Sequence, residues 1–144
     1  SNLKKLRHYD EILIEKFIPG REIQVAILGN EKLGVIELKP KRMFYDYEAK
    51  YNPKAKTEHI IPVNISKKKY DEVTSTALKA HKLLKCRGVT RSDFRLNGDK
   101  FYLLETNTQP GMTALSLVPE IAKYRNISFA QLIDKILLDA SINK

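Results

Sequence analysis

Apolar residues alternate or cluster over short stretches in much of the chain, and this pattern predicts β-strands. The expected strands are residues 11–17, 22–28, 34–38, 59–63, 89–96 and 100–106. The second and third of these are joined by residues 29–34, "GNEKLG", whose glycines favour a hairpin connection. Residues 39–57 have no hydrophobic period and contain two prolines, so we expect a long loop there, and long ordered loops are often functional.

Two further stretches have the spacing of helices. Apolar residues at steps of three and four run from Tyr70 to Leu84, which predicts a helix with one buried face. Ser66 is its expected N-cap, and Gly88 lies just beyond it, as a helix terminator would. Near the end of the chain, residues 128–131, "SFAQ", have the form of a capping box and predict the start of an amphipathic helix. Because strands and helices are mixed without strict alternation, we predict an α+β fold, a mostly antiparallel sheet packed by helices.

The turn between the last two strands decides which of their side chains meet. A two-residue turn at 97–98 would put Asp93 and Glu105 on opposite faces of the hairpin, whereas a three-residue loop, at 97–99 or bulged at 96–98, would put them on one face. The longer loop also gathers four apolar side chains on the other face: Phe94, Leu96, Tyr102 and Leu104. Burial of that face favours the odd-length loop, which is our prediction.

In that register three oxygen-bearing side chains lie near one end of a sheet face, namely Asp93, Glu105 and Asn107. Carboxylate and amide oxygens are hard ligands that suit Mg²⁺ or Mn²⁺, and a Mg²⁺ ion held by so few protein groups usually binds a nucleotide phosphate as well. The alternative is that Asp93 only pairs with Arg91 or Arg95, and the sequence leaves both readings open.

The chain is basic, with 26 Lys and Arg against 17 Asp and Glu, a net charge of +9 that favours anionic partners. A nucleic-acid-binding module would need aromatic residues and Arg on an exposed sheet face, but here that face carries carboxylates, so we expect no nucleic acid. We also expect no membrane span, because no apolar run approaches about 18 residues. The single cysteine, Cys86, excludes an internal disulfide and fits a reducing cytoplasm.

Four stretches carry a resemblance to a known family: "LIEKFIPGRE", "FYDYEAKY", "TRSDFRL" and "LLETNTQPGMTALSLVP". From about Glu11 to its end, the chain resembles the C-terminal part of the D-alanine–D-alanine ligases, which are ATP-grasp enzymes. The resemblance implies an ATP-grasp lobe in a cytoplasmic enzyme that uses ATP to join two D-alanines for peptidoglycan synthesis, with a homodimer possible for the full-length form. The rival within enzymes is another ATP-grasp carboxylate–amine ligase with a different acceptor.

The resemblance also implies roles for individual positions. The ligands of two Mg²⁺ or Mn²⁺ ions on the ATP phosphates would be Asp93, Glu105 and Asn107. The nucleotide would be bound by Glu15, Lys16, Phe17, Ile18, Glu22 and Lys50. The catalytic groups would be Arg91, Gly111 and Lys50. The D-alanine substrates would be bound by Tyr51, Arg91, Gly111, Ser116 and Leu117.

Residues 44–51, "FYDYEAKY", would be a flap that closes over the phosphates and excludes water, which protects an acyl phosphate from hydrolysis. Nothing in the chain matches the glycine-rich phosphate loop or the N-terminal domain of the family. We therefore expect residues 1–144 to be the C-terminal portion of an ATP-grasp domain. Alone they should have no ligase activity and bind ATP weakly at best.

Overall fold

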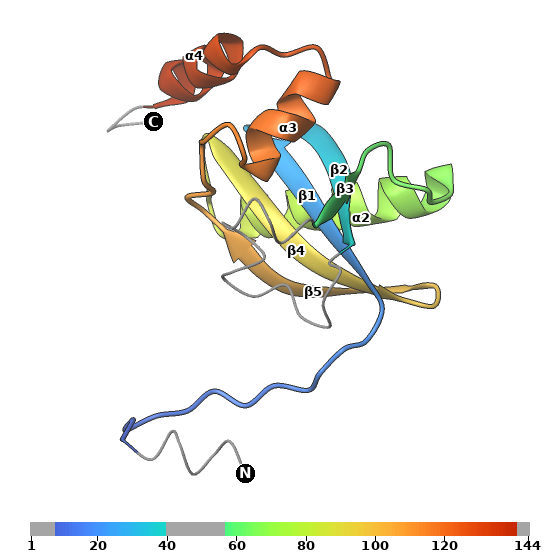
Figure 1. Cartoon of the computed structure of the whole chain (residues 1–144). Helices are drawn as coiled ribbons and strands as arrows, with labels where there is room; N and C mark the ends of the chain where they lie inside the picture. Colours follow the sequence, from blue (N-terminus) through green and yellow to red (C-terminus); the bar gives the residue numbers. More distant parts are fainter. Residues whose placement is uncertain (1–7, 40–56, 141–144) are drawn as a thin grey trace.

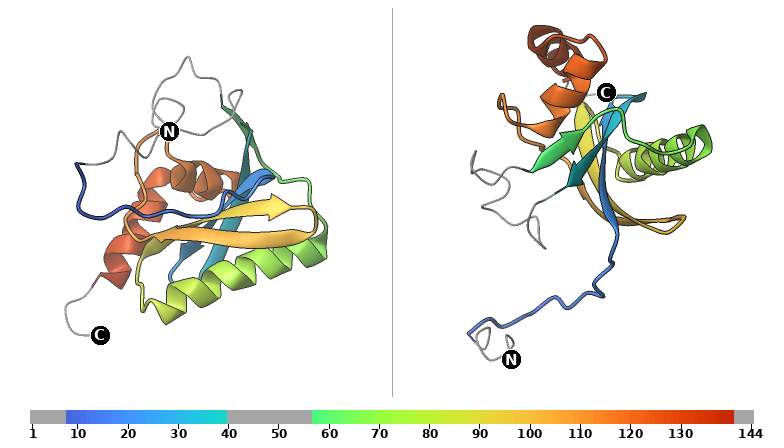
Figure 2. Two further views of the ribbon diagram at one scale, coloured as in Figure 1. Left: turned by 90° about the horizontal axis from the view of Figure 1, so that it is seen from below. Right: turned by 45° about the vertical axis from the view of Figure 1, so that its right-hand side comes forward.

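The computed structural model describes residues 8–39 and 57–140 of the chain. Five strands form one antiparallel sheet in the order β3-β2-β1-β4-β5, with α2 on one face and α3 and α4 on the other (Figures 1 and 2). The elements are β1 (Arg21–Leu28), β2 (Glu31–Lys39), β3 (Glu58–Ile60), α2 (Lys67–Leu83), β4 (Val89–Asn97), β5 (Lys100–Asn107), α3 (Leu117–Tyr124) and α4 (Phe129–Asp139). This arrangement confirms the predicted α+β class and the antiparallel sheet. No helix in the described part of the chain is both long and apolar enough to cross a membrane.

The second half of the central strand β1 is apolar on both faces because helices cover both. Val25 and its alternate neighbours pack toward α2, whereas Ala26 and Leu28 pack with α3. Such double burial explains why β1 reads as a nearly continuous apolar run. Strand β1 ends at Leu28 as predicted, but β2 begins at Glu31, inside the predicted connection, so that Leu28 pairs with Glu31. The hairpin is therefore closed by the two residues Gly29 and Asn30.

Helix α2 begins as predicted but ends differently. The Ser66 hydroxyl accepts a hydrogen bond from the Lys69 N–H, which caps the first turn. Its buried residues are Val73, Thr74, Ala77 and His81. The helix ends before Gly88 is reached, because Lys85 takes the left-handed conformation (φ 53°) and the Cys86 N–H bonds back to the His81 carbonyl. Leu84, predicted on the buried face, is 58% exposed.

The predicted strand at residues 11–17 is not formed. Residues 11–19 carry no helix or strand and run away from the sheet, and Leu13 is 84% exposed (Figure 1). Strand β1, which follows, already has β2 on one edge and β4 on the other. Residues 11–19 pair with none of the five strands, and apolar, β-branched residues form a strand only where a partner is available.

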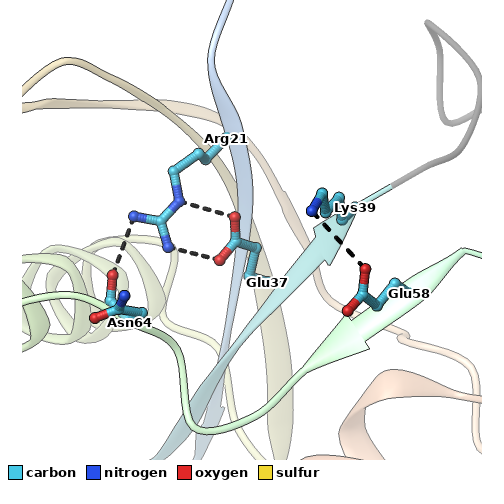
Figure 3. A network of polar contacts seen from close by, with 5 residues as sticks. All are labelled: Arg21, Glu37, Lys39, Glu58 and Asn64. Atoms are coloured by element: carbon cyan, nitrogen blue, oxygen red, sulfur yellow. Dashed lines mark hydrogen bonds and ion pairs between the residues drawn. The ribbon is translucent and has the colours of Figure 1, made fainter.

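Polar contacts hold the start of β1 and the edge strand β3 in place (Figure 3). Arg21 donates from Nε and Nη2 to the two Glu37 oxygens at 2.8 and 2.6 Å, and from Nη1 to the Asn64 carbonyl at 3.1 Å. The hydrogen bond to Glu37 raises the pKa of Arg21. Strands β2 and β3 are further linked by an ion pair of Lys39 with Glu58 at 4.0 Å. These contacts tie β1, β2 and the segment before α2 into one unit.

Candidate functional site

The β4–β5 hairpin brings Asp93 and Glu105 together, although not by the predicted loop. Asn97 pairs with Lys100, so the turn has two residues and the expected three-residue loop is wrong. Farther along, Phe94 pairs with Leu103 but Asp93 pairs with Glu105, which leaves Leu104 as an extra residue in a β-bulge. The bulge changes the register by one residue. Asp93 and Glu105 therefore face each other as predicted.

The same bulge changes which side chains of β5 reach the core. Before the bulge Phe101 lies opposite Leu96, and its ring packs edge-on against Phe94 with centroids 6.2 Å apart. Tyr102 and Leu104, which we predicted in that apolar face, are not there: Tyr102 lies opposite Arg95, and Leu104 is 51% exposed. After a two-residue turn, each residue of β5 near the tip points to the opposite face from the one it would take after a three-residue loop. This explains why Tyr102 and Leu104 are absent from the apolar face.

Cross-strand partners point to the same face of a sheet, so the pairings of β1, β4 and β5 define rows of side chains. Three successive rows are Glu22–Arg95–Tyr102, Gln24–Asp93–Glu105 and Ala26–Arg91–Asn107. Their face is the one on which α3 packs, because Ala26 belongs to the core cluster of α3. We call these three rows the polar face. It unites five predicted site residues: Glu22, Arg91, Asp93, Glu105 and Asn107.

Asp93 is the most buried acid of the polar face, with 8% of its surface exposed. Arg91 donates to both of its oxygens, from Nε at 2.8 Å and from Nη2 at 3.1 Å. The alternative left open by the sequence, pairing of Asp93 with an arginine, is thus realised, and Arg91 is the partner. A carboxylate has about four lone-pair sites, so this forked contact still leaves oxygen lone pairs that a cation could use.

The other two candidate ligands are less enclosed. Glu105 is exposed, and the Asn107 Oδ1 accepts a hydrogen bond from the Gln109 N–H at 3.0 Å. No three His, Cys, Asp or Glu side chains cluster as a metal site within residues 8–39 and 57–140. Any cation here would therefore be held by two carboxylates and amide oxygens. That donor set fits Mg²⁺ or Mn²⁺, which accept few protein ligands and complete their shells with water and phosphate.

Arg95 holds Glu22 and the start of β1 at the other end of the polar face. Its Nη2 lies 3.3 Å from the Glu22 Oε2, and its Nη1 donates to the Gly20 carbonyl at 3.1 Å. Gly20 has φ +122°, and a Cβ there would lie 2.2 Å from the Leu96 carbonyl oxygen. Only glycine allows this approach of the chain to β4. Sequence reasoning missed this role of Arg95, because the pairing of β1 with β4 cannot be read from local pattern.

The loop before α3 contains the other predicted substrate residues. The Ser116 Oγ accepts a hydrogen bond from the Thr113 N–H at 2.9 Å and does not cap α3, although Ser116 is the N-cap residue. A Cβ on Gly111 would lie 2.9 Å from that Oγ, so the loop closes tightly on itself. Leu117 is 6% exposed, and its side chain belongs to the core cluster. Only the backbone of Leu117 is therefore suited to binding a ligand.

The remaining predicted residues are not gathered on the polar face. Glu15, Lys16, Phe17 and Ile18 lie in the stretch without secondary structure that precedes β1, and Phe17 is 60% exposed. Lys50 and Tyr51, with the rest of the 44–51 segment, lie outside the described residues.

A comparison with known protein families matches the part of the chain that contains these segments. A family model described as "D-ala D-ala ligase C-terminus" matches residues 1–138. The chain belongs to the D-alanine–D-alanine ligase family. The D-alanine–D-alanine ligase of Pelagibacter ubique (strain HTCC1062) is 66% identical over 144 residues, which are 100% of this chain and 47% of that relative. The D-alanine–D-alanine ligase of Paramagnetospirillum magneticum (strain AMB-1) is 48% identical over 130 residues, 86% of this chain and 42% of that relative.

Solved members of the family share the fold. A crystal structure of D-alanine–D-alanine ligase from Bacillus anthracis complexed with ATP superposes with a TM-score of 0.73 at 32% identity, covering 87% of this chain and 41% of that chain. A second structure of the Bacillus anthracis enzyme gives a TM-score of 0.74 at 33% identity, with 87% and 40% covered. The chain thus spans about half the length of the family members it matches.

Proposed function

We propose that this chain is the part of an ATP-dependent, ADP-forming D-alanine–D-alanine ligase that binds the phosphates and cations. Membership of the family supports the reaction, and the polar face supports the assignment of residues. The observation that carries it is the row that joins Asp93 to Glu105, next to the row that joins Arg91 to Asn107. These pairings put two carboxylates, an amide and a guanidinium on one face.

In this reaction the carboxylate of one D-alanine attacks the terminal phosphorus of ATP, and ADP leaves. The amine of a second D-alanine then attacks the acyl phosphate, loses a proton, and expels phosphate as the peptide bond forms. Asp93, Glu105 and Asn107 would hold two Mg²⁺ or Mn²⁺ ions, which when bound neutralise phosphate charge during the transfer. Glu22 would accept hydrogen bonds from the ribose hydroxyls, while residues 15–18 and Lys50 would contact the rest of the nucleotide.

Arg91 would have two tasks in this scheme. Its guanidinium orients Asp93 through the forked contact at 2.8 and 3.1 Å. With the Gly111 N–H, it would also stabilise the negative charge that develops on the substrate oxygen when the amine attacks. The backbone at Ser116 and Leu117, at the start of α3, suits the carboxylate of the second D-alanine, because a helix N-terminus attracts anions. Tyr51 would contact the second D-alanine as well.

The proposal can be tested in a chimera that joins residues 1–144 to the N-terminal portion of the Pelagibacter ubique ligase, of which this chain covers 47%. ADP release and D-alanyl-D-alanine should both appear when ATP, Mg²⁺ and D-alanine are supplied. Asp93→Asn and Arg91→Gln should each lower kcat by about 100-fold or more, the usual loss when one charge-stabilising group is removed. The matched control is Arg87→Gln, because Arg87 pairs with Asp139 at 3.8 Å, away from the polar face.

Three results would refute the proposal or its details. A chimera that folds and releases no ADP with any amino-acid acceptor would refute the ligase assignment. A panel in which another amino acid is preferred to D-alanine would favour the rival ATP-grasp ligase. Robust dipeptide formation by the 144 residues alone would show that a phosphate loop outside them is not needed.

A further inference from the structure

Gln24 is a polar side chain in the middle of β1, the central strand of the sheet. Its exposed fraction is 1%, and its Oε1 has no hydrogen-bond partner among the residues that the structure describes. Buried side-chain oxygens are nearly always hydrogen-bonded, and one that is not calls for a specific explanation, such as a water or ion that belongs to the site.

Packing alone does not explain a glutamine here. Gln24 lies between Ile36 on β2 and Asp93 on β4, and Ile36 is fully buried. An aliphatic residue of similar size would fill the same space without a buried oxygen. The nearby guanidinium groups are engaged elsewhere, Arg91 with Asp93 and Arg95 with Glu22. The Gln24 Oε1 thus receives no hydrogen bond from either guanidinium group.

The position of Gln24 in its row indicates which ligand would satisfy it. Across the sheet the order is Gln24, Asp93, Glu105, so a cation between the two carboxylates would have Gln24 on the far side of Asp93. Mg²⁺ retains several waters when only a few carboxylates hold it. Phosphate oxygens cannot satisfy the Gln24 oxygen, because both groups are hydrogen-bond acceptors. A water on the cation can, because it donates.

We propose that the Gln24 Oε1 accepts a hydrogen bond from a water bound to the divalent cation that Asp93 and Glu105 hold. Gln24 then positions this water and, through it, the cation. This inference rests on the proposed cation site of the ligase, and it adds a residue that the pattern of the sequence does not single out.

The test uses Gln24→Met and Gln24→Glu in the chimera. Binding of Mn²⁺ in the presence of a non-hydrolysable ATP analogue is followed by electron paramagnetic resonance, and the thermal midpoint is measured without ligands. Gln24→Met keeps the length of the side chain and removes the oxygen. It should weaken Mn²⁺ binding about 10- to 100-fold, the usual effect of losing a group around metal ligands. The thermal midpoint should stay equal or rise, because an unsatisfied polar group has been removed.

Gln24→Glu keeps an acceptor oxygen and loses the amide donor. It should therefore bind Mn²⁺ at least as tightly as the unsubstituted chimera if the oxygen is the group that acts, because the acceptor is kept and the added carboxylate also attracts the cation. Ile36→Met is the control for packing, because it changes the shape of the neighbouring side chain and removes no polar atom. Its Mn²⁺ binding should equal that of the unsubstituted chimera.

Unchanged Mn²⁺ binding in Gln24→Met would overturn the inference. So would an equal loss in Gln24→Met and Gln24→Glu, because the amide N–H would then be the active group, donating to phosphate. Asp93→Asn separates this inference from the proposed function. If Asp93→Asn abolishes Mn²⁺ binding and Gln24→Met does not, only the role of Gln24 fails. If Asp93→Asn binds Mn²⁺ normally, the proposed cation site fails, and the role of Gln24 with it.

Discussion

Replacing Gly20 with alanine tests whether the entry to β1 is held against β4 as closely as the structure shows. The new Cβ would lie 2.2 Å from the Leu96 carbonyl oxygen and 2.8 Å from its carbon, where ordinary contacts begin at 3.4 Å. Both atoms belong to the backbone of β4 and cannot rotate away. The substitution must therefore displace either the start of β1 or the neighbouring strand.

The expected cost follows from two contributions. A non-glycine residue held at φ +122° is strained by about 1–3 kcal/mol, and forced overpacking costs about 1–3 kcal/mol more. We thus expect Gly20→Ala to lower the free energy of unfolding by about 4 kcal/mol, within a range of about 2–6 kcal/mol. Gly98→Ala is the matched control, because Gly98 also has a positive φ, +56°, but nothing lies within 4 Å of its added Cβ. It should cost only about 1–2 kcal/mol.

Urea unfolding of the 144-residue chain, followed by circular dichroism, measures both values. The unfolding slope should stay the same in the two variants, so that the difference in midpoint reports stability alone. Gly20→Ala should lose about 1–3 kcal/mol more than Gly98→Ala, which is the contribution of the close approach to Leu96. Equal losses in the two variants would refute the reasoning, because positive φ would then account for the whole effect.

Three other changes have defined outcomes. Ser128→Ala removes the hydroxyl that accepts a hydrogen bond from the Gln131 N–H at 3.2 Å in the capping box of α4. It should lower the free energy of unfolding by about 1 kcal/mol, and an unchanged urea midpoint would contradict this role of the cap. Burial lowers the pKa of His81 below 6.5, so the unfolded chain binds the proton more readily than the folded chain. The free energy of unfolding should therefore fall as the pH drops through 6.5, by at most about 1.4 kcal/mol per pH unit. His81→Asn should flatten this dependence, and equal slopes in both proteins would count against it. Arg95→Met removes the cation that lies 3.3 Å from Glu22, and in the chimera should raise the KM for ATP about tenfold with the KM for D-alanine unchanged; a parallel rise of both constants would argue against a role at the nucleotide.

The fold could be predicted largely because burial leaves a regular trace in sequence. Strand β1 was readable from a nearly continuous apolar run, and helix α2 from apolar residues at steps of three to four. Residues 11–17 have the same strand-like composition and form no strand, because a strand needs a partner and none of the five strands pairs with them. Local composition carries no information about which edges are free, so this error could not be avoided from the sequence alone.

The site was predictable in its residue types but less so in its geometry. Asp93 and Glu105 were expected on one face, and they are paired there. The reason given was wrong, since a bulge at Leu104 and not an odd-length turn sets their register. Gln24 was missed altogether, because its importance depends on lying opposite Asp93, on a strand more than 60 residues away in the chain. Contacts between distant strands follow from topology, which short motifs do not encode.

The bulge at Leu104 divides the β4–β5 hairpin into two parts whose pairing registers differ by one residue. Toward the tip, the alternation of side chains is set by Phe101, which packs under the sheet against α2. Toward the base, it is set by Glu105, on the side where ligands are expected. One spare residue thus lets a single continuous strand serve as hydrophobic packing along one half and as chemistry along the other. Without the bulge, the regular pairing of the tip would continue, bring Leu104 opposite Asp93 and turn Glu105 and Asn107 to the other face, so the bulge decides which side chain of this strand meets Asp93.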